Sequence, residues 1–461
     1  MKFPLIKSFD FPYEPVRLLD LFKNEPCVFF LESSLVDPNR GRYSFLGFDP
    51  FRTIQQKGQN PFPALRRAFA HYHEQRPAAL PLTSGMVGFL SYDAGFYLEK
   101  IPSRSCDDLN LPDCFFGFYD TVFVIDHLRR RLFITSSGLP ERTQNRRMRR
   151  AQQRLKEMEG KLSIGTQGSP SDLKKKKAPH EPIPWRSNCS AKMYEMMVKK
   201  AKDYIRRGDI YQVNLAQRFE WEPPGNHGVI EGVQLYKTLR QSSPACFAGY
   251  LNAGNFQIVS SSPERFLRLN GQRVQTRPMK GTRPRGAGPQ EDRRMRRELD
   301  NSAKERAELL MITDLERNDL GRVCEYGSVK VKTMRSLETY RTVFQTTSTI
   351  EGILRKDQDG FDLLQSCFPG GSITGCPKIR AMEIIEELES ARRGIYTGTL
   401  GYMDFSGNLD FNILIRTFLV KDRKIYFHVG SGIVADSTPA TEYQETLVKA
   451  RGLKDALKYK S

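Results

Sequence analysis

Strand-like and helical segments mix along this 461-residue chain without the regular strand–helix–strand alternation that builds parallel sheets. Residues 28–31 and 121–125 are hydrophobic runs typical of buried strands, and 247–251 with 256–259 predict a hairpin. This irregular order favours an α+β fold over a doubly wound sheet. We expect a large two-layer β-sandwich with surrounding helices.

Most of the structural signal lies after residue 190. Gly208 is placed to end the first helix of this part, since glycine favours the residue after a helix. The periodicity predicts helices at 193–208, 293–315, 378–390 and 442–457, and strands at 210–219, 396–404, 410–420 and 424–428.

Changes in composition suggest three regions. Residues 1–137 form an N-terminal region of mixed strands and loops, and 188–461 form a region dense in motifs. Between them, 138–187 combine a polar helix at 141–161 with a linker rich in Gly, Ser, Pro and Lys from residue 162 to 184.

The chain is basic, with 72 Lys and Arg against 53 Asp and Glu, a formal net charge of +19. Much of this charge lies between residues 142 and 177, and we interpret it as a solvated helix face and linker. No recognition helix, zinc finger or RNP motif accompanies it, so we expect no nucleic-acid partner.

Other features indicate a cytoplasmic protein without a membrane partner. No run of about 18 apolar residues occurs, and the first residues carry charges and prolines in place of a signal peptide's apolar core. The eight cysteines form no C-x-x-C pair, so a disulfide framework or zinc ribbon is not expected.

Two acidic pairs suggest a divalent cation. Glu305 and Glu308 are three residues apart, as are Glu442 and Glu445, so each pair lies on one face of a predicted helix. Opposed faces would offer carboxylate oxygens, the ligands that Mg²⁺ prefers. Either pair alone is more commonly just exposed.

Glycine-rich segments could bind an anion. Residues 368–378 form a loop that enters a predicted helix, whose first amides favour a carboxylate. Gly430, Ser431 and Gly432 follow a predicted strand, and Arg416 could contact a carboxylate through two hydrogen bonds. Neither a G-x-G-x-x-G nor a Walker A motif occurs.

Two residues suggest catalysis. Lys280 lies between Met279 and Gly281, and partial burial there would lower its pKa and make a nucleophilic amine. Glu264 follows Ser-Pro and in a cleft could serve as a general acid. The alternatives are a surface lysine and a turn residue.

Together these segments resemble the chorismate-utilising enzymes, which include anthranilate, aminodeoxychorismate, isochorismate and salicylate synthases. The matching strings cover most of residues 190–455 in the family's order. They include RRGDIYQVNLAQRF (206–219), SSPERF (261–266), TRPMKGTRPRG (276–286), KERAELLMITDLERNDLGRVC (304–324) and FPGGSITGCPKIRAMEIIEELE (368–389). The string LESSLVDPNRGRYSFLGFDP (31–50) resembles the anthranilate and aminodeoxychorismate branch.

The resemblance implies a two-layer sandwich with chorismate in a cleft and Mg²⁺ as cofactor. It implies that Glu308 and Glu445 bind the metal, with Glu305 and Glu442 acting through water. Residues matching the substrate contacts are Gln212, Thr282, Ser372, Thr374, Tyr396, Arg416, Gly430, Ser431 and Gly432.

Three positions bear on which member this chain resembles. Water-using members have a lysine where Gln212 stands, so the resemblance implies ammonia as nucleophile. Lys280 replaces the alanine usual in anthranilate synthases, as in aminodeoxychorismate synthases, where the lysine is thought to attack the ring. Gln345 replaces a histidine associated with expelling pyruvate, which agrees with a product that keeps its enolpyruvyl group.

We therefore expect an aminodeoxychorismate synthase component I that makes 4-amino-4-deoxychorismate for 4-aminobenzoate and folate synthesis. The alternatives are anthranilate synthase component I, or a catalytically inactive basic binding protein. No glutaminase nucleophile motif occurs, so ammonia would come from a glutaminase subunit in a heterodimer. Leu31, Glu32 and Ser33 match a position where tryptophan binds in relatives, and we hypothesise a tryptophan site there.

Overall fold

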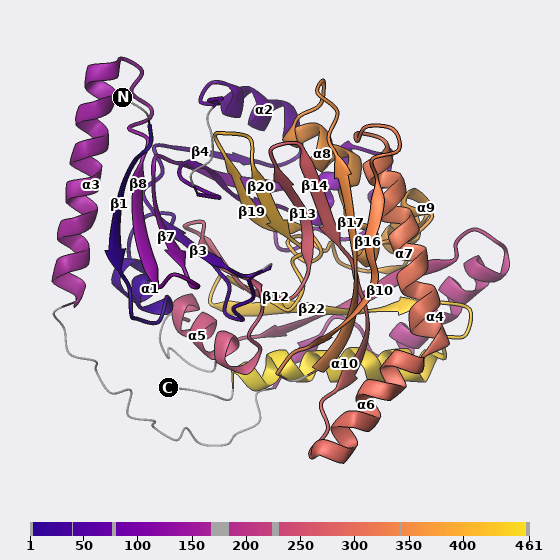
Figure 1. Ribbon diagram of the computed structural model, residues 1–461. Coiled ribbons are helices and arrows are strands. Elements are labelled where there is room, and N and C mark those ends of the chain that lie inside the picture. The colour runs from indigo at the N-terminus through magenta and orange to yellow at the C-terminus, as the bar shows by residue number, and fades with distance from the viewer. Residues whose placement is uncertain are drawn as a thin grey trace.

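The computed structural model describes residues 3–38, 40–75, 80–166, 184–223, 230–341 and 343–457, without the side chains of 164–166. Two large antiparallel sheets form its layers (Figure 1). In the described residues the first sheet has twelve strands, in the order β1 (Leu5–Asp10), β8 (Arg131–Ser136), β7 (Thr121–Asp126), β3 (Tyr43–Gly47), β2 (Phe29–Glu32), β11 (Phe247–Asn252), β12 (Phe256–Ser262), β21 (Thr417–Lys421), β22 (Lys424–Ile433), β10 (Gln212–Trp221) and β18 (Gly375–Cys376), with β9 (Arg186–Ser187) beside β10.

The second sheet has ten strands over the same residues. Their order is β15 (Met279–Pro284), β17 (Val343–Ile353), β14 (Arg273–Arg277), β13 (Arg265–Asn270), β20 (Leu409–Asn412), β19 (Thr399–Asp404), β5 (Gly85–Leu90), β6 (Cys114–Tyr119) and β4 (Arg52–Gln56), with β16 (Lys330–Thr339) beside β17.

Helices surround the two layers, as Figure 1 shows. They are α1 (Val16–Phe22), α2 (Phe62–Ala70), α3 (Gln144–Thr166), α4 (Ala191–Arg206), α5 (Gly232–Ser242), α6 (Pro289–Asn301), α7 (Ala303–Gly321), α8 (Gly360–Cys367), α9 (Lys378–Leu388) and α10 (Pro439–Ala456), with short 3₁₀ turns η1 (Tyr92–Tyr97) and η2 (Gly371–Ile373).

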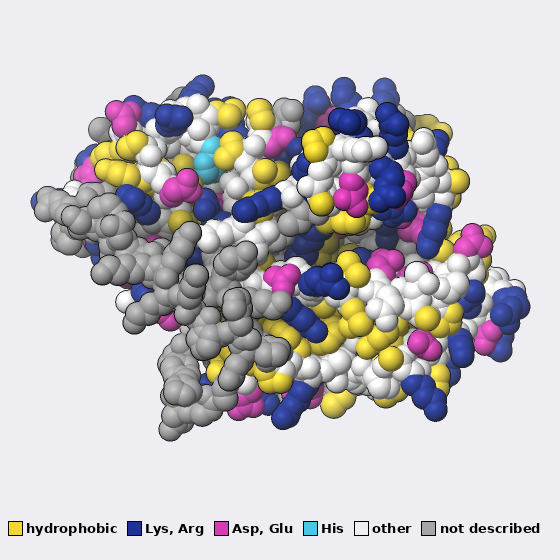
Figure 2. Space-filling view, turned by 90° about the horizontal axis from the view of Figure 1, so that it is seen from below, with side chains coloured by type: hydrophobic (Ala, Val, Ile, Leu, Met, Phe, Trp, Pro, Cys, Tyr) yellow, Lys and Arg dark blue, Asp and Glu magenta, His cyan; other side chains and the backbone are white. Residues whose placement is uncertain are grey.

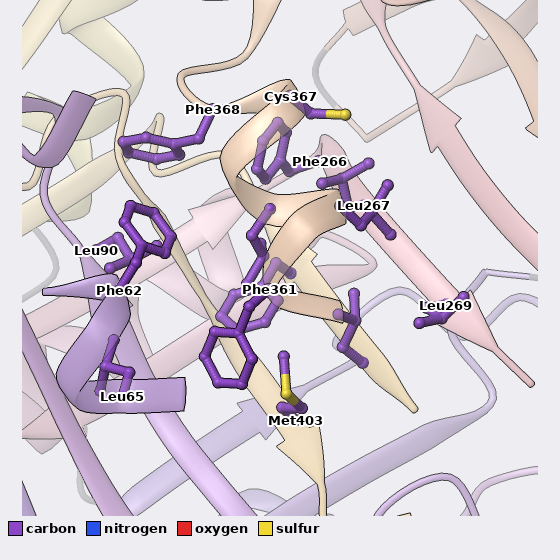
Figure 3. Close-up of a cluster of buried hydrophobic side chains, with 14 of the residues drawn as sticks. Phe62, Leu65, Leu90, Phe266, Leu267, Leu269, Phe361, Cys367, Phe368 and Met403 are labelled. Carbon is purple, nitrogen blue, oxygen red and sulfur yellow. The ribbon is translucent and has the colours of Figure 1, made fainter. Parts of the chain in front are cut away.

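The hydrophobic core lies both between the sheets and outside them. Phe29 and Val124 of the first sheet share one buried cluster with Phe89 and Tyr402 of the second, which makes the two sheets a sandwich. A further cluster joins the second sheet to α2 and α8 (Figure 3). This arrangement confirms the predicted α+β two-layer sandwich with surrounding helices.

Strands from the two ends of the chain share both sheets. In the first sheet β2 pairs with β11, and in the second β5 pairs with β19. The predicted regions 1–137 and 188–461 are therefore joined by continuous backbone hydrogen bonding.

Four predicted elements differ from the structure. The helix expected at 293–315 is two helices, because the Ser302 side chain caps α7 by accepting from the Glu305 amide. The strand expected at 410–420 is β20 and β21, which lie in different sheets. Gly430 to Gly432 lie inside β22 and do not follow it. The linker expected from residue 162 begins as the end of α3, and residues 167–183 lie outside the described residues.

Some of the arginines in the basic helix α3 form ion pairs with the rest of the protein. Arg150 and Arg154 both face the buried carboxylate of Asp120, with nitrogen–oxygen distances of 3.1 and 3.6 Å. The predicted solvated face therefore describes only part of this helix. On the face in Figure 2, Lys and Arg are interspersed with acidic and hydrophobic side chains. None of the described helices is long and apolar enough to span a membrane.

We expect Asp120→Asn to loosen α3. It removes the negative charge between two arginines, one of them buried, and should lower the free energy of unfolding by about 3 kcal/mol. Urea unfolding followed by circular dichroism measures the change. The control is Asp10→Asn, because the Asp10–Arg131 pair is exposed and should contribute at most about 1 kcal/mol. Equal effects of the two substitutions would contradict the expectation.

Candidate active site

Lys280 lies at a bulge in β15. Lys280 pairs with Thr346 and Thr282 with Gln345, so Gly281 is the extra residue, and its φ of +74° suits glycine. The Lys280 Nζ donates to the Ser372 carbonyl at 2.8 Å. Burial lowers the pKa of Lys280, and the charges of Glu308 and Glu264 oppose this effect.

Gln212 faces the same point as Lys280. A Cβ atom added to Gly432 would lie 2.5 Å from Gln212 Nε2 and 3.9 Å from Lys280 Nζ, so both side chains converge on this glycine. The Gln212 side chain is buried, and its Oε1 has no hydrogen-bond partner in the described part of the chain. Buried amide oxygens normally have one, so Gln212 is available to a bound molecule.

Glu264 lies in the turn between β12 and β13. Its carboxylate accepts from the Met279 amide at 3.3 Å. Burial raises the pKa of Glu264 to about 7, although the Ser372 side chain and the Lys280 and Arg416 charges favour the ionised form. A carboxyl with this pKa is suited to donating a proton near neutral pH.

Arg416 joins β20 to β21 at the point where the chain passes between sheets. Its φ is +51°, and its carbonyl accepts from the Ser261 amide at 3.1 Å. Burial lowers the pKa of its guanidinium, and among the described residues the group has neither a hydrogen bond nor an ion pair. A partly desolvated guanidinium without a carboxylate favours an anionic ligand.

Tyr396 lies against the glycines of β22. A Cβ atom at Gly430 would be 2.8 Å from the Tyr396 hydroxyl and 2.9 Å from Asn214 Oδ1. The Tyr396 ring stacks on His428, with centroids 5.0 Å apart. Thr374 has a backbone role instead, since its hydroxyl donates to the Gly370 carbonyl at 2.9 Å. Tyr396 and Asn214 thus pack so closely on the Gly430 backbone that a side chain at this position would meet them.

Gln345 bonds to the strand that carries Lys280. Its Nε2 donates to the Thr282 hydroxyl at 3.2 Å, and its buried Oε1 has no partner in the described residues. Gln345 therefore holds Thr282 in place and leaves one amide oxygen unused.

Helices α7 and α10 bring the two acidic pairs together. Lys304 Nζ lies 4.0 Å from Glu308 and 3.8 Å from Glu442, and Glu305 accepts from Arg283 at 3.2 Å. Glu442 also accepts from Ser431 and, at 2.6 Å, from Ser437. The predicted opposition of the acidic faces is therefore present.

The electrostatics of these acids fit a cation. Burial raises the pKa of Glu308, and the nearby charges of Glu305 and Glu445 raise it further. Burial also acts on Glu445, but Lys449, at 2.8 Å, outweighs it and lowers the pKa of that group. In the described residues no three acidic, His or Cys side chains already converge as a metal site. The donor set is that of Mg²⁺, which commonly uses one or two carboxylates and keeps waters.

Leu31, Glu32 and Ser33 lie elsewhere, at a cavity of about 400 Å³ beside Arg40 and Phe247. Glu32 is buried and accepts from the Tyr236 hydroxyl at 2.6 Å and from Arg240 at 2.8 Å. None of the predicted catalytic or metal-binding residues lines this cavity. The structure therefore separates the hypothesised tryptophan site from the residues around Lys280.

Three residues near the cleft were missed by the sequence analysis. Lys304 and Lys449 are each four residues from an acid, a helical spacing that could have indicated them. Asn214 of β10 contacts Tyr396, which lies in the turn before β19, and a single sequence has no local signal for such a long-range contact.

Comparisons with known proteins identify the family of this chain. The chorismate binding enzyme family matches residues 30–455. The chain is 39% identical to anthranilate synthase component 1 of Thermus thermophilus, over 95% of this chain and 94% of that protein. It is 36% identical to aminodeoxychorismate synthase component 1 of Bacillus subtilis, over 90% of this chain and 89% of that protein.

A solved structure has the same fold. Anthranilate synthase component I of Streptococcus pneumoniae has 31% identity and a TM-score of 0.77, covering 91% of this chain and 94% of that one. The fold and the family match place this chain among the chorismate-utilising enzymes. Within that family its relatives divide between anthranilate and aminodeoxychorismate synthases.

Proposed function

We propose that the protein is aminodeoxychorismate synthase component I, which converts chorismate and ammonia to 4-amino-4-deoxychorismate. The observation that carries this proposal is the half-buried amine of Lys280, whose pKa is lowered by desolvation and which lies near Glu264 and Gln212. An amine with a lowered pKa is a nucleophile near neutral pH.

The residues have the following proposed roles. Arg416, Tyr396 and the backbone of Gly430 to Gly432 bind the chorismate ring carboxylate. Lys280 attacks ring carbon 2 while the 4-hydroxyl leaves as water with the proton of Glu264. Ammonia then adds at carbon 4 and expels the lysine amine, so that the enolpyruvyl group is retained.

Gln212 and the acidic pairs complete the site. Gln212 cannot deprotonate water, which favours ammonia as the nucleophile. Glu308 and Glu445 would hold Mg²⁺, with Glu305 and Glu442 around it, and the ion would neutralise the substrate carboxylate. The ammonia would come from a glutaminase subunit, as the component 1 names of the relatives suggest.

The competing function is anthranilate synthase component I. Relatives with that name are as similar to this chain as those named for aminodeoxychorismate synthesis. Two residues favour the proposed function. Lys280 stands where anthranilate synthases usually have alanine, and Gln345 lacks a titratable proton for the loss of pyruvate.

Mass spectrometry of the product separates the two functions. Purified protein is incubated with chorismate, Mg²⁺ and ammonium at alkaline pH. We expect a product with the mass of 4-amino-4-deoxychorismate. Anthranilate would establish the competing function. Binding to nucleic acid without chorismate turnover would instead support the inactive binding protein.

Removal of divalent cations should abolish product formation, and added Mg²⁺ should restore it. We expect Glu308→Gln to raise the Mg²⁺ concentration for half-maximal rate about tenfold or more, because one carboxylate ligand is lost. Titration of the rate with Mg²⁺ measures this. The control is Glu298→Gln, on the exposed surface of α6, and an unchanged Mg²⁺ dependence in the Glu308 variant would contradict the assignment.

Tryptophan should stabilise the protein if it binds at Leu31, Glu32 and Ser33. A ligand that binds only the folded state raises the free energy of unfolding by about 2.7 kcal/mol at 100 times Kd, and Tm rises with ligand concentration. Thermal-shift titration with tryptophan measures this, and phenylalanine is the control ligand. No shift at saturating tryptophan would remove the hypothesis.

A further inference from the structure

Glu316, on the inner side of α7, has a hydrogen bond that reveals its protonation state. Its Oε2 lies 2.8 Å from the Thr276 hydroxyl, and that hydroxyl lies 2.6 Å from the Phe266 carbonyl oxygen. A threonine hydroxyl has one proton, and a carbonyl can only accept. The single Thr276 proton can go to only one of these two oxygens at a time, and both contacts are satisfied together when the Glu316 carboxyl is protonated and donates to Thr276.

Glu316 lies next to the proposed general acid. A Cβ atom at Gly371 would be 3.5 Å from Glu316 Cγ, so this glycine packs directly on the acid. The next residue, Ser372, contacts the Glu264 carboxyl with its side chain and accepts from Lys280 with its carbonyl. One short loop thus touches Glu316 through Gly371 and the catalytic pair through Ser372.

The surroundings of Glu316 keep it neutral. The elements beside it contribute the apolar cluster of Figure 3, which includes Phe266 and Phe368. The charged groups that face it are Glu264, Asp319 on its own helix, and Lys378 of α9. Lys378 donates to Asp319 at 2.5 Å, so its charge is largely used there.

The negative charge of Glu264 opposes the ionisation of Glu316. Burial raises the pKa of Glu316 to about 8, and the negative charge of Glu264 is the next contribution. Glu264 is faced by Lys280, Arg416 and Ser372 and has a pKa of about 7. Such a pair titrates as a unit, and ionising both members is harder than ionising either alone.

We propose that Glu316 is a positioning residue for Glu264. Glu316 is protonated and is fixed by Thr276 beneath the Gly371–Ser372 loop. Together Glu316 and Glu264 form a two-carboxyl unit that keeps one proton at the site. Its catalytic consequence rests on the proposed function, in which Glu264 gives a proton to the departing hydroxyl. The protonation itself is a property of the resting protein. It can therefore be tested without turnover.

The first test is an infrared pH titration of the unliganded protein. We expect carboxylic-acid carbonyl signals that are lost near pH 7 from Glu264 and near pH 8 from Glu316 and the buried Asp93. Glu316→Gln, which still donates to Thr276, should remove the Glu316 part of the signal near pH 8, and Asp93→Asn identifies the part that remains. A wild-type protein with no such signal above pH 6 would overturn the proposal whatever the variants do.

The second test is the pH profile of kcat/KM for chorismate, expressed per free ammonia. In the wild type the high-pH limb should begin near pH 7 and extend over a second titration near pH 8, and in Glu316→Gln only the titration near pH 7 should remain. An equal loss of rate at every pH, with no shift, would indicate a merely structural role and overturn the proposal. The infrared test does not depend on the proposed function, because it measures the unliganded protein and would give the same result if the protein makes anthranilate.

Thr276 provides a matched pair of variants. Thr276→Ser keeps the hydroxyl and should retain the wild-type titration of Glu316. Thr276→Val removes the acceptor of the Glu316 proton, so the Glu316 signal should be lost at lower pH. A shift to higher pH would mean that Thr276 donates to an ionised carboxylate, which would overturn the proposal.

Discussion

Replacing Lys280 with alanine should abolish amination of chorismate, with a loss in kcat/KM of roughly 10³-fold or more. The substitution removes the amine that is proposed to bond to ring carbon 2, while Arg416 and Tyr396 remain to bind the substrate. Product formation with ammonium as nitrogen source measures the loss. The dissociation constant for chorismate should change much less than the rate.

The same lysine should carry a covalent adduct when ammonia is withheld. Incubation with chorismate and Mg²⁺ should add the mass of chorismate less one water to the peptide that contains Lys280. The control is Lys332→Ala, because Lys332 is an exposed lysine on β16. Undiminished product formation by the Lys280 variant would show that the amine is not the nucleophile and would favour the competing function.

Glu264→Gln should lower the rate by roughly 10²- to 10⁴-fold, the usual contribution of a general acid. Glutamine keeps the shape and the contact with the Met279 amide but has no proton to give. In the wild type the acid form is needed, so kcat/KM should fall as the pH rises through the titration that begins at about 7. The variant should lack this limb.

Thermal stability gives an independent check on Glu264. Its folded-state pKa lies above the ordinary glutamate value of 4.5, so the wild type loses stability as the pH rises from that value toward 7. The Glu264→Gln variant should therefore gain in Tm relative to the wild type over that range. Glu351→Gln, on β17 of the second sheet, is the control. A pH-independent difference would contradict the raised pKa.

Local patterns predicted the fold class and the helical acids well. The spacing of Glu305 with Glu308 and of Glu442 with Glu445 predicted shared faces, because helical geometry depends only on local sequence. The break at Ser302 was also visible in principle, since Ser302 and Glu305 have the spacing of a helix cap. Strong helix formers on both sides concealed it.

Long-range pairing explains the elements that the sequence could not predict. Residues 430–432 extend β22 because they pair with β10, more than 200 residues away in the chain. At Arg416 the chain changes sheets with a positive φ, and arginine is not a residue that signals such a conformation. Local sequence patterns predict neither the pairing of residues 430–432 nor the change of sheet at Arg416.

Glu316 was missed for a different reason. In the sequence it is one acid among several in a charged helix, and such residues are usually exposed. Only the packing of α7 against Thr276 and Gly371 makes it buried.

The pairing of β2 with β11 and of β5 with β19 has a consequence for biosynthesis. During translation β2 emerges roughly 200 residues before its partner, which at typical ribosomal rates corresponds to roughly 10 to 40 s, and β5 waits longer still. Until then the early strands have unsatisfied edges that can pair with other chains. Closure of the two sheets, and with it the arrangement of residues around Lys280, therefore has to wait until most of the chain has been made.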